Sequence, residues 1–166
     1  MDKREKLSLS ERDICTKFIT PAIEKAGWDI KKQMREEVSF TDGRIYVKGH
    51  LTSRGQKKRA DYILYYKPNI PLAVVEAKDN THSIRSGIQQ ALDYAKHLDV
   101  PFVFSSNGDG FLFNDKTSTG KAIESELSND DFPSPSSLWK KYCDWKGITT
   151  PDIEKVVSQD YFFDSK

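Results

Sequence analysis

The hydrophobic positions near the start of the chain follow a helical period. Four apolar side chains recur every fourth residue: Ile14, Phe18, Ala22 and Ala26. Ser8 and Glu11 stand before this run with the spacing of a capping box, and Gly27 follows it. The pattern predicts one helix that starts near Ser8, bends at Pro21 and ends at Gly27.

The next part of the chain has the pattern of strands. Residues 38–40 and 44–47 flank a Thr-Asp-Gly turn and predict two strands. Residues 60–66 and 71–78 are rich in β-branched, aromatic and aliphatic side chains, and the residues between them have turn composition. These two segments predict a central β-hairpin.

A second apolar stripe predicts a helix over residues 81–98, with two strands after it at 101–104 and 110–113. This order of elements predicts an α/β (α+β) fold with a mixed β-sheet flanked by helices. Beyond Thr117 the chain is rich in Ser, Thr, Asp and Pro, with one short helical signal. We therefore expect a core at 1–116 and a C-terminal linker with short helices at 117–166.

Composition narrows the class of protein. Hydrophobic residues make up 37% and charged residues 31%, which excludes a disordered chain. A net charge of +1 argues against binding nucleic acid by bulk charge alone, although residues 54–59 carry four cations. The two cysteines indicate neither a disulfide framework nor a zinc site, and no apolar run reaches the roughly 20 residues of a membrane span. A cytoplasmic protein without membrane contact is expected.

The candidate chemistry lies in the central hairpin. If the hairpin turns at Pro68 and Asn69, paired residue numbers sum to 137, so Asp61 faces Glu76 on one side of the sheet. Two opposed carboxylates repel each other and need a compensating cation. Magnesium prefers hard oxygen ligands and is commonly held by one or two carboxylates, so a Mg²⁺ site is predicted here.

Four cations extend this prediction toward DNA. Lys78 lies two residues after Glu76 and therefore on the same face, where its ammonium can reach water or a phosphoryl oxygen. Arg59 would pair with Lys78 in the same register, which places Lys57 and Lys58 beside the metal face. Metal, carboxylates and lysine suit phosphodiester hydrolysis.

Several of these residues also have interpretations without function. A Glu-x-Lys triplet arises easily in a highly charged chain, and only its place at the end of an apolar strand favours catalysis. The N3 position of a capping box explains Glu11 without a catalytic role, and whether Glu11 takes part in metal binding stays open. Gln90 and Tyr94 are expected on an exposed face of the second helix with Gly87, as surface residues or as DNA contacts.

Asp61, Glu76-Ala-Lys78 and Gln90-Ala-Leu-Asp-Tyr94 resemble the PD-(D/E)xK nuclease motif with the Q-x-x-x-Y extension of RecB-like nucleases. The proline of the motif is replaced by Ala60, at a position that supplies no ligand. The order of further motifs is similar to the N-terminal nuclease domain of type I restriction enzyme R subunits: Ser10-Glu-Arg-Asp, Ala26-Gly-Trp28, Arg59-Ala-Asp-Tyr62, Ser105-Ser-Asn-Gly108, Phe132-Pro-Ser-Pro135 and Leu138-Trp139.

This resemblance implies a restriction-endonuclease-like core that acts as a type I site-specific deoxyribonuclease. It implies Mg²⁺ bound by Asp61, Glu76 and the Ala77 carbonyl, with Lys78 as the catalytic cation and Gln90 and Tyr94 supporting DNA positioning or cleavage. Double-stranded DNA and the specificity and methylation subunits of a restriction complex are the implied partners. ATP would belong to a motor domain, and no phosphate-binding loop of a motor occurs in these 166 residues.

Two other functions remain open from the residues. A stand-alone DNA repair or recombination nuclease would use the same chemistry without partner subunits. A non-catalytic DNA-binding or docking module would use the cations of residues 54–59 for phosphate contacts, with the carboxylate pair vestigial.

Overall fold

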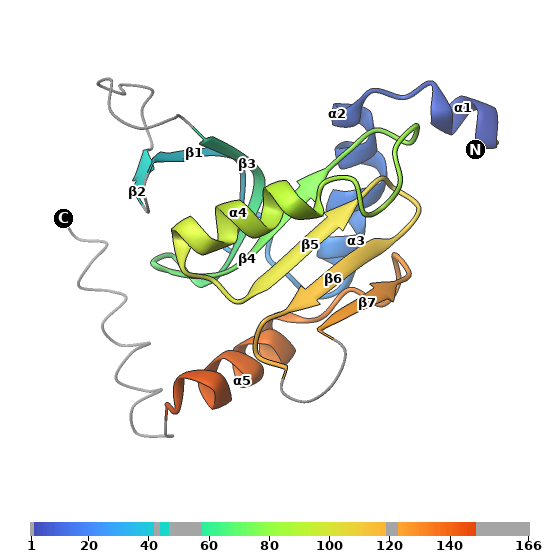
Figure 1. The fold of residues 1–166 in the computed structure, drawn as a ribbon. Helices are drawn as coiled ribbons and strands as arrows, with labels where there is room; N and C mark the ends of the chain where they lie inside the picture. The colour runs from blue at the N-terminus through green and yellow to red at the C-terminus, as the bar shows by residue number, and fades with distance from the viewer. Residues whose placement is uncertain (1, 42–43, 47–57, 119–122, 149–166) are drawn as a thin grey trace.

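The computed structural model describes residues 2–41, 44–46, 58–118 and 123–148, which form a seven-stranded mixed sheet flanked by helices (Figure 1). The strand order is β2-β1-β3-β4-β5-β6-β7, and the β4–β5 pair is parallel whereas the other pairs are antiparallel. The strands are β1 (Met34–Thr41), β2 (Arg44–Tyr46), β3 (Lys58–Lys67), β4 (Ile70–Ala77), β5 (Phe102–Ser106), β6 (Phe111–Asp115) and β7 (Glu124–Leu127). The helices are α1 (Lys3–Leu7), α2 (Glu11–Ile14), the π-helical η1 (Cys15–Ile19), α3 (Thr20–Lys25), α4 (Ile88–Leu98) and α5 (Pro135–Lys146).

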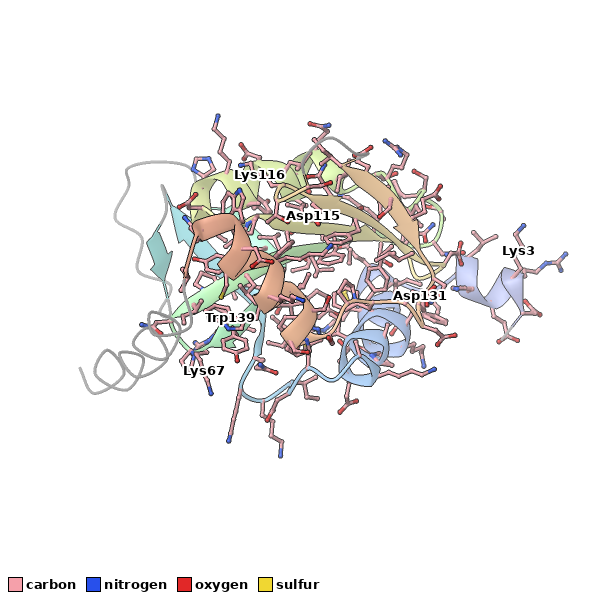
Figure 2. All side chains as sticks on the ribbon, turned by 90° about the horizontal axis from the view of Figure 1, so that it is seen from below. Lys3, Lys67, Asp115, Lys116, Asp131 and Trp139 are labelled. Carbon is pink, nitrogen blue, oxygen red and sulfur yellow. The ribbon has the colours of Figure 1, made fainter. Side chains whose placement is uncertain are left out.

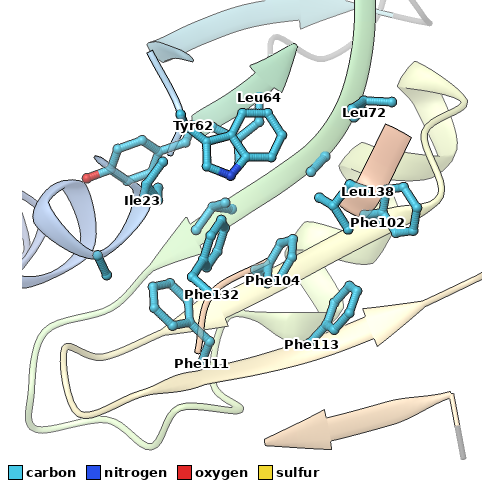
Figure 3. Packing of buried hydrophobic residues seen from close by; sticks show 14 of the residues in the cluster. Ile23, Tyr62, Leu64, Leu72, Phe102, Phe104, Phe111, Phe113, Phe132 and Leu138 are labelled. Carbon is cyan, nitrogen blue, oxygen red and sulfur yellow. The ribbon is translucent and has the colours of Figure 1, made fainter. Parts of the chain in front are cut away.

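Hydrophobic side chains cover both faces of the sheet. Residues from α2, η1, α3 and α5 pack on one face against a cluster of phenylalanines from β5 and β6 together with Phe132 (Figure 3). Helix α4 packs on the other face through Ile88, Ala91, Tyr94 and Ala95. Alternate residues along β3 to β6 therefore enter opposite cores, as the two-residue period of strands requires. The predicted mixed sheet flanked by helices is confirmed.

The first helix differs from its prediction. Ser10, not Ser8, is the N-cap, and its capping-box partner is Asp13 rather than Glu11. Ser8 instead ends α1, where its hydroxyl donates to the Glu5 carbonyl oxygen. The turn of π-helix before Pro21 accommodates the residue that lacks an N–H donor, so helical structure continues to Lys25.

The central hairpin keeps the predicted register. Tyr62 pairs with Val75 and Leu64 with Ala73, and both sums are 137. A bulge near Tyr65 shifts the pairing only close to the turn. The register therefore holds at the end of the hairpin that carries the acidic residues.

Residues 123–148 pack onto the same core. β7 extends the sheet beside β6, although no strand was predicted there. Helix α5 lies across one face of the sheet (Figure 2), where Leu138, Trp139 and Cys143 are buried. Trp28 and Trp139 are packing residues as expected, whereas Trp145 is 38% exposed. No helix in the described part of the chain is long and apolar enough to cross a membrane.

Candidate active site

Asp61 and Glu76 meet at one end of the central hairpin. The Asp61 N–H donates to Glu76 Oε1 at 3.1 Å, and the Ala77 N–H donates to Asp61 Oδ2 at 2.8 Å. Each carboxylate is thus held by the backbone of the strand that carries the other one. Glu76 is only 3% exposed, whereas Asp61 is half-buried. The predicted pairing of these two acids on one face is confirmed.

The electrostatics of this pair are unfavourable without a cation. Burial is the largest effect and, with the negative charge of Asp61 and a hydrogen bond to its side chain, it raises the pKa of Glu76 to about 9. A backbone hydrogen bond and the charge of Lys78 oppose this shift but do not cancel it. A proton on Glu76 or a positive ion beside it would relieve this repulsion.

Lys78 lies immediately after β4, as the sequence indicates. Its N–H donates to the Ser106 carbonyl oxygen at 2.9 Å, which extends the parallel contact with β5. The positive charge of Lys78 opposes the rise in the pKa of both Glu76 and Glu11, so the ammonium group lies within electrostatic reach of both carboxylates. The structure therefore brings Asp61, Glu76 and Lys78 together.

Glu11 also belongs to this site, which the sequence analysis left open. It is the first residue of α2, because Asp13 takes the capping role that was assigned to Glu11. Burial, followed by the charge of Asp61, raises the pKa of Glu11. The Ser10-x-x-Asp13 spacing also fits a capping box, and this signal could have shown from the sequence that Glu11 is not needed as the capping residue.

An open pocket of about 310 Å³ lies in front of Asp61. Its walls come from α2, η1, β1 and β3, and its lining residues are Glu11, Arg12, Cys15, Glu36, Glu37, Arg59, Asp61 and Tyr62. Tyr62 is fixed at the pocket wall by a 2.9 Å hydrogen bond between its hydroxyl and Thr20 Oγ1. Sequence reasoning did not identify Arg12 or Glu37, because only the tertiary fold brings α2 next to β1.

The predicted basic residues have different outcomes. Arg59 lines the pocket, but its guanidinium donates to Glu37 Oε1 at 2.8 Å. The expected pairing of Arg59 with Lys78 is not formed, because β4 ends at Ala77. On the other edge of β3, Arg59 pairs with Ser39 of β1. Lys58 begins β3, where its side chain is not described, and Lys57 lies outside the described residues.

Gln90 and Tyr94 lie on α4, which begins at Ile88 rather than at Thr81. Gln90 is exposed and its Nε2 donates to the Tyr94 hydroxyl. Tyr94 is only 8% exposed and packs in the core, so the predicted exposed patch is wrong for Tyr94 and for the buried Gly87. The angular count failed for Gly87 because residues 81–87 form turns instead of helix, and it failed for Tyr94 because this ring packs in the core between α4 and the sheet.

Gly87 explains how α4 approaches the site. A Cβ atom at this position would lie 3.0 Å from Ser105 Oγ and 3.2 Å from Glu76 Cβ. The Gly87 N–H donates to Ser105 Oγ at 3.1 Å, and this hydroxyl donates to the Ile84 carbonyl oxygen. Ser105 and Gly87 therefore pack directly against the strand end that carries Glu76.

The donor set fits a small hard cation with few protein ligands. Within the described ranges, no group of three or more His, Cys, Asp and Glu side chains is placed to hold a metal ion. Asp61, Glu76 and the adjoining Ala77 carbonyl would leave further coordination positions to water and substrate, as magnesium sites usually do. The unfavourable pairing of two carboxylates supports this fit.

Comparison with known proteins identifies the family. Residues 45–122 match the family model described as type I restriction enzyme R protein N terminus. The chain is 51% identical over 158 residues to the type I restriction enzyme EcoAI endonuclease subunit of Escherichia coli. This match covers 95% of the chain but only 19% of that relative, so the chain spans about a fifth of its length.

A solved structure agrees with the sequence comparison. A fragment assigned to an HsdR subunit of a type I restriction enzyme from Vibrio vulnificus superposes with a TM-score of 0.75 at 40% identity. It matches 90% of this chain and 28% of that structure's chain. The sequence motifs, the sheet that carries Asp61 and Glu76, and these relatives agree: the chain belongs to the family of N-terminal regions of type I restriction enzyme R proteins.

Proposed function

We propose that this chain is a magnesium-dependent endonuclease domain that hydrolyses DNA phosphodiester bonds within the restriction subunit of a type I complex. The observation that carries the proposal is the buried Glu76 carboxyl group against Asp61, with Lys78 beside it. The match to a protein named as an endonuclease subunit supports the same reaction. The specificity and methylation subunits, and an ATP-dependent motor elsewhere in the polypeptide, are part of this proposal.

Each residue has a chemical role in this reaction. Asp61, Glu76 and the Ala77 carbonyl would hold Mg²⁺, which when bound activates water and stabilises charge on the phosphate. Lys78 is placed to orient the attacking water and to stabilise negative charge that develops on the phosphoryl oxygens. Glu11 faces the same charges from α2 and would accept a proton from the attacking water or orient that water.

Gln90 supports the site from α4. Its side chain is exposed, and its hydrogen bond to the buried Tyr94 hydroxyl fixes its orientation. Gln90 would contact the DNA backbone, and Tyr94 would act as a positioning residue through Gln90.

Calorimetric titration of Mg²⁺ and Mn²⁺ into the chain tests the metal centre. Asp61→Asn and Glu76→Gln are expected to abolish binding, because each removes a charged ligand. Glu126→Gln, an exposed carboxylate change on β7, is the matched control and should bind as the wild type does. Equal affinity in all four proteins would refute the metal site.

Cleavage tests the reaction itself. In the assembled restriction complex, Lys78→Ala is expected to abolish cleavage of supercoiled DNA while metal binding by the chain persists. Turnover of DNA by the chain alone would instead favour a stand-alone repair or recombination nuclease. Undiminished cleavage by the Lys78→Ala complex would favour a docking module with its catalytic centre elsewhere.

A further inference from the structure

Glu37 adopts an uncommon backbone conformation in the middle of β1. Its φ is +51°, and among the described residues Asp99, at the end of α4, is the other non-glycine residue with positive φ. The ladder with β3 continues on both sides, through Glu36–Tyr62 and Val38–Ala60. Glu37 therefore falls opposite Asp61, next to the proposed metal site. Left-handed backbone is disfavoured for a residue with a Cβ atom, so other contacts must hold it.

Those contacts come from two arginines. Glu37 Oε1 lies 2.8 Å from an Nη atom of Arg59 and 3.6 Å from an Nη atom of Arg12. Both arginine side chains are largely solvent-exposed, at 60% and 73%, and both line the pocket that contains Asp61. The Glu37 carboxylate thus lies near two arginines, one from α2 and one from β3, at the edge of the site.

The charge of the pocket makes this arrangement relevant to DNA. Four of the described residues that line it are carboxylates, and the two cations among those described residues are the arginines that Glu37 engages. A DNA strand cannot approach Asp61 favourably unless its phosphates find free cations there. An arginine guanidinium binds phosphate with the same planar donors that it offers to a carboxylate.

We propose that Arg12 and Arg59 form a phosphate-binding subsite beside Asp61, and that Glu37 occupies this subsite in the DNA-free chain as an internal substitute for phosphate. The inference rests on the proposed nuclease function and adds a substrate contact and a restraint to it. The backbone phosphate of a DNA strand displaces the Glu37 carboxylate, and no bond is made or broken. With this backbone conformation the Glu37 carboxylate lies within reach of both arginines.

DNA binding without divalent metal tests this proposal. The probe is a short fluorescein-labelled DNA duplex, titrated in EDTA and followed by anisotropy. Glu37→Gln is expected to tighten binding about 3- to 10-fold, because the competing charge is removed and both arginines are freed. Glu36→Gln is the matched control: it removes the same charge from the neighbouring exposed residue of the same pocket, whose carboxylate contacts the Thr20 hydroxyl instead of an arginine. It should change affinity by about 2-fold or less.

Variants of the two arginines, alone and combined with Glu37→Gln, separate release of the arginines from a general charge effect. Arg12→Gln and Arg59→Gln should each weaken binding and lower the slope of log affinity against log salt by about 1. Adding Glu37→Gln to the Arg12→Gln/Arg59→Gln protein should give no further gain. Glu37→Asn serves as a second variant, because asparagine tolerates the left-handed backbone and guards against misfolding of the glutamine variant.

Three results would overturn the subsite. These are equal gains from Glu37→Gln and Glu36→Gln, a gain that persists without both arginines, and no DNA binding by the wild type or by either Glu37 variant. Metal titration of the same proteins is independent of these outcomes. If the proposed metal centre is wrong, the wild type will not bind Mg²⁺ in that titration. If only the phosphate subsite is wrong, Mg²⁺ binding will be intact.

Discussion

At the scale of one residue, Glu76 shows how the fold makes the charged form of a carboxyl group unfavourable. Burial and the neighbouring Asp61 raise the pKa of Glu76 to about 9 in the folded chain, from its ordinary value of 4.5. Below the lower value the group is protonated whether the chain is folded or unfolded. Between the two values only the folded chain retains the proton, so raising the pH favours unfolding across this window. The residue that would bind metal thus destabilises the metal-free chain.

We therefore expect Glu76→Gln to stabilise the metal-free chain at pH 7 by about 2 kcal/mol. The amide oxygen can still accept from the Asp61 N–H, and the amide group removes the ionisation that the site opposes. Urea denaturation in EDTA at several pH values measures the effect, which should shrink as the pH is lowered toward 4.5, the ordinary pKa of the carboxyl group. Glu126→Gln is the surface control. A glutamine variant less stable than the wild type at pH 7 would contradict the electrostatic account.

Metal binding should be coupled to proton release for the same reason. A ligand must be deprotonated to hold Mg²⁺, and Glu76 retains its proton up to a pKa of about 9. The affinity for Mg²⁺ is therefore expected to increase between about pH 6 and pH 8, with about one proton released per ion. Calorimetry in buffers of different ionisation enthalpy measures this number. An affinity that does not change with pH, together with no proton release, would show that Glu76 is already charged.

At the scale of elements, the site depends on how closely α4 approaches β4 and β5. Gly87 allows this approach, since a Cβ atom there would lie 3.0 Å from Ser105 Oγ and 3.2 Å from Glu76 Cβ. Gly87→Ala is expected to cost about 1 to 2 kcal/mol of stability and to weaken Mg²⁺ binding, because β4 or Ser105 must shift. Ser86→Ala, at the preceding exposed position, should change neither quantity appreciably. Denaturation and metal titration of both variants decide the point. Unchanged metal affinity in Gly87→Ala would mean that the strand end tolerates the shift.

At the scale of the whole molecule, residues 123–148 complete the core rather than forming a linker beside it. Trp139 is 7% exposed and stacks on Tyr66 at a ring-centroid distance of 4.1 Å, which joins α5 to β3. Phe132 packs on Phe104 and Phe111 in the same cluster. These contacts tie the C-terminal elements to the sheet that carries Asp61 and Glu76.

Two tryptophans of α5 provide a matched test of this integration. Trp139→Ala is expected to destabilise the chain by about 3 to 5 kcal/mol, because it leaves a cavity against the sheet. Trp145→Ala, on the same helix but 38% exposed, should cost less than about 1 kcal/mol. Thermal or urea denaturation compares the two. Similar small losses from both would mean that α5 contributes little to the core.

The sequence by itself determined the central hairpin and its chemistry. The turn composition around Pro68 and Asn69 sufficed to set the register, because the position of a short turn fixes which residues of the two strands face each other. That register placed Asp61 opposite Glu76 and put Lys78 nearby, as the structure has them. The family resemblance followed from the same residues.

Tertiary contacts decided what local patterns could not. The capping-box spacing fits both Ser8 and Ser10, and only packing of the helix selected Ser10 and turned Glu11 toward Asp61. Tyr94 has a polar end that suits a surface, yet its ring fills the space between α4 and the sheet. Arg12, Glu37 and Arg59 are far apart or unremarkable in sequence, and they meet because α2, β1 and β3 converge beside the site. The physical reason is common to all three cases: burial and charge pairing depend on neighbours from distant segments, which no local period encodes.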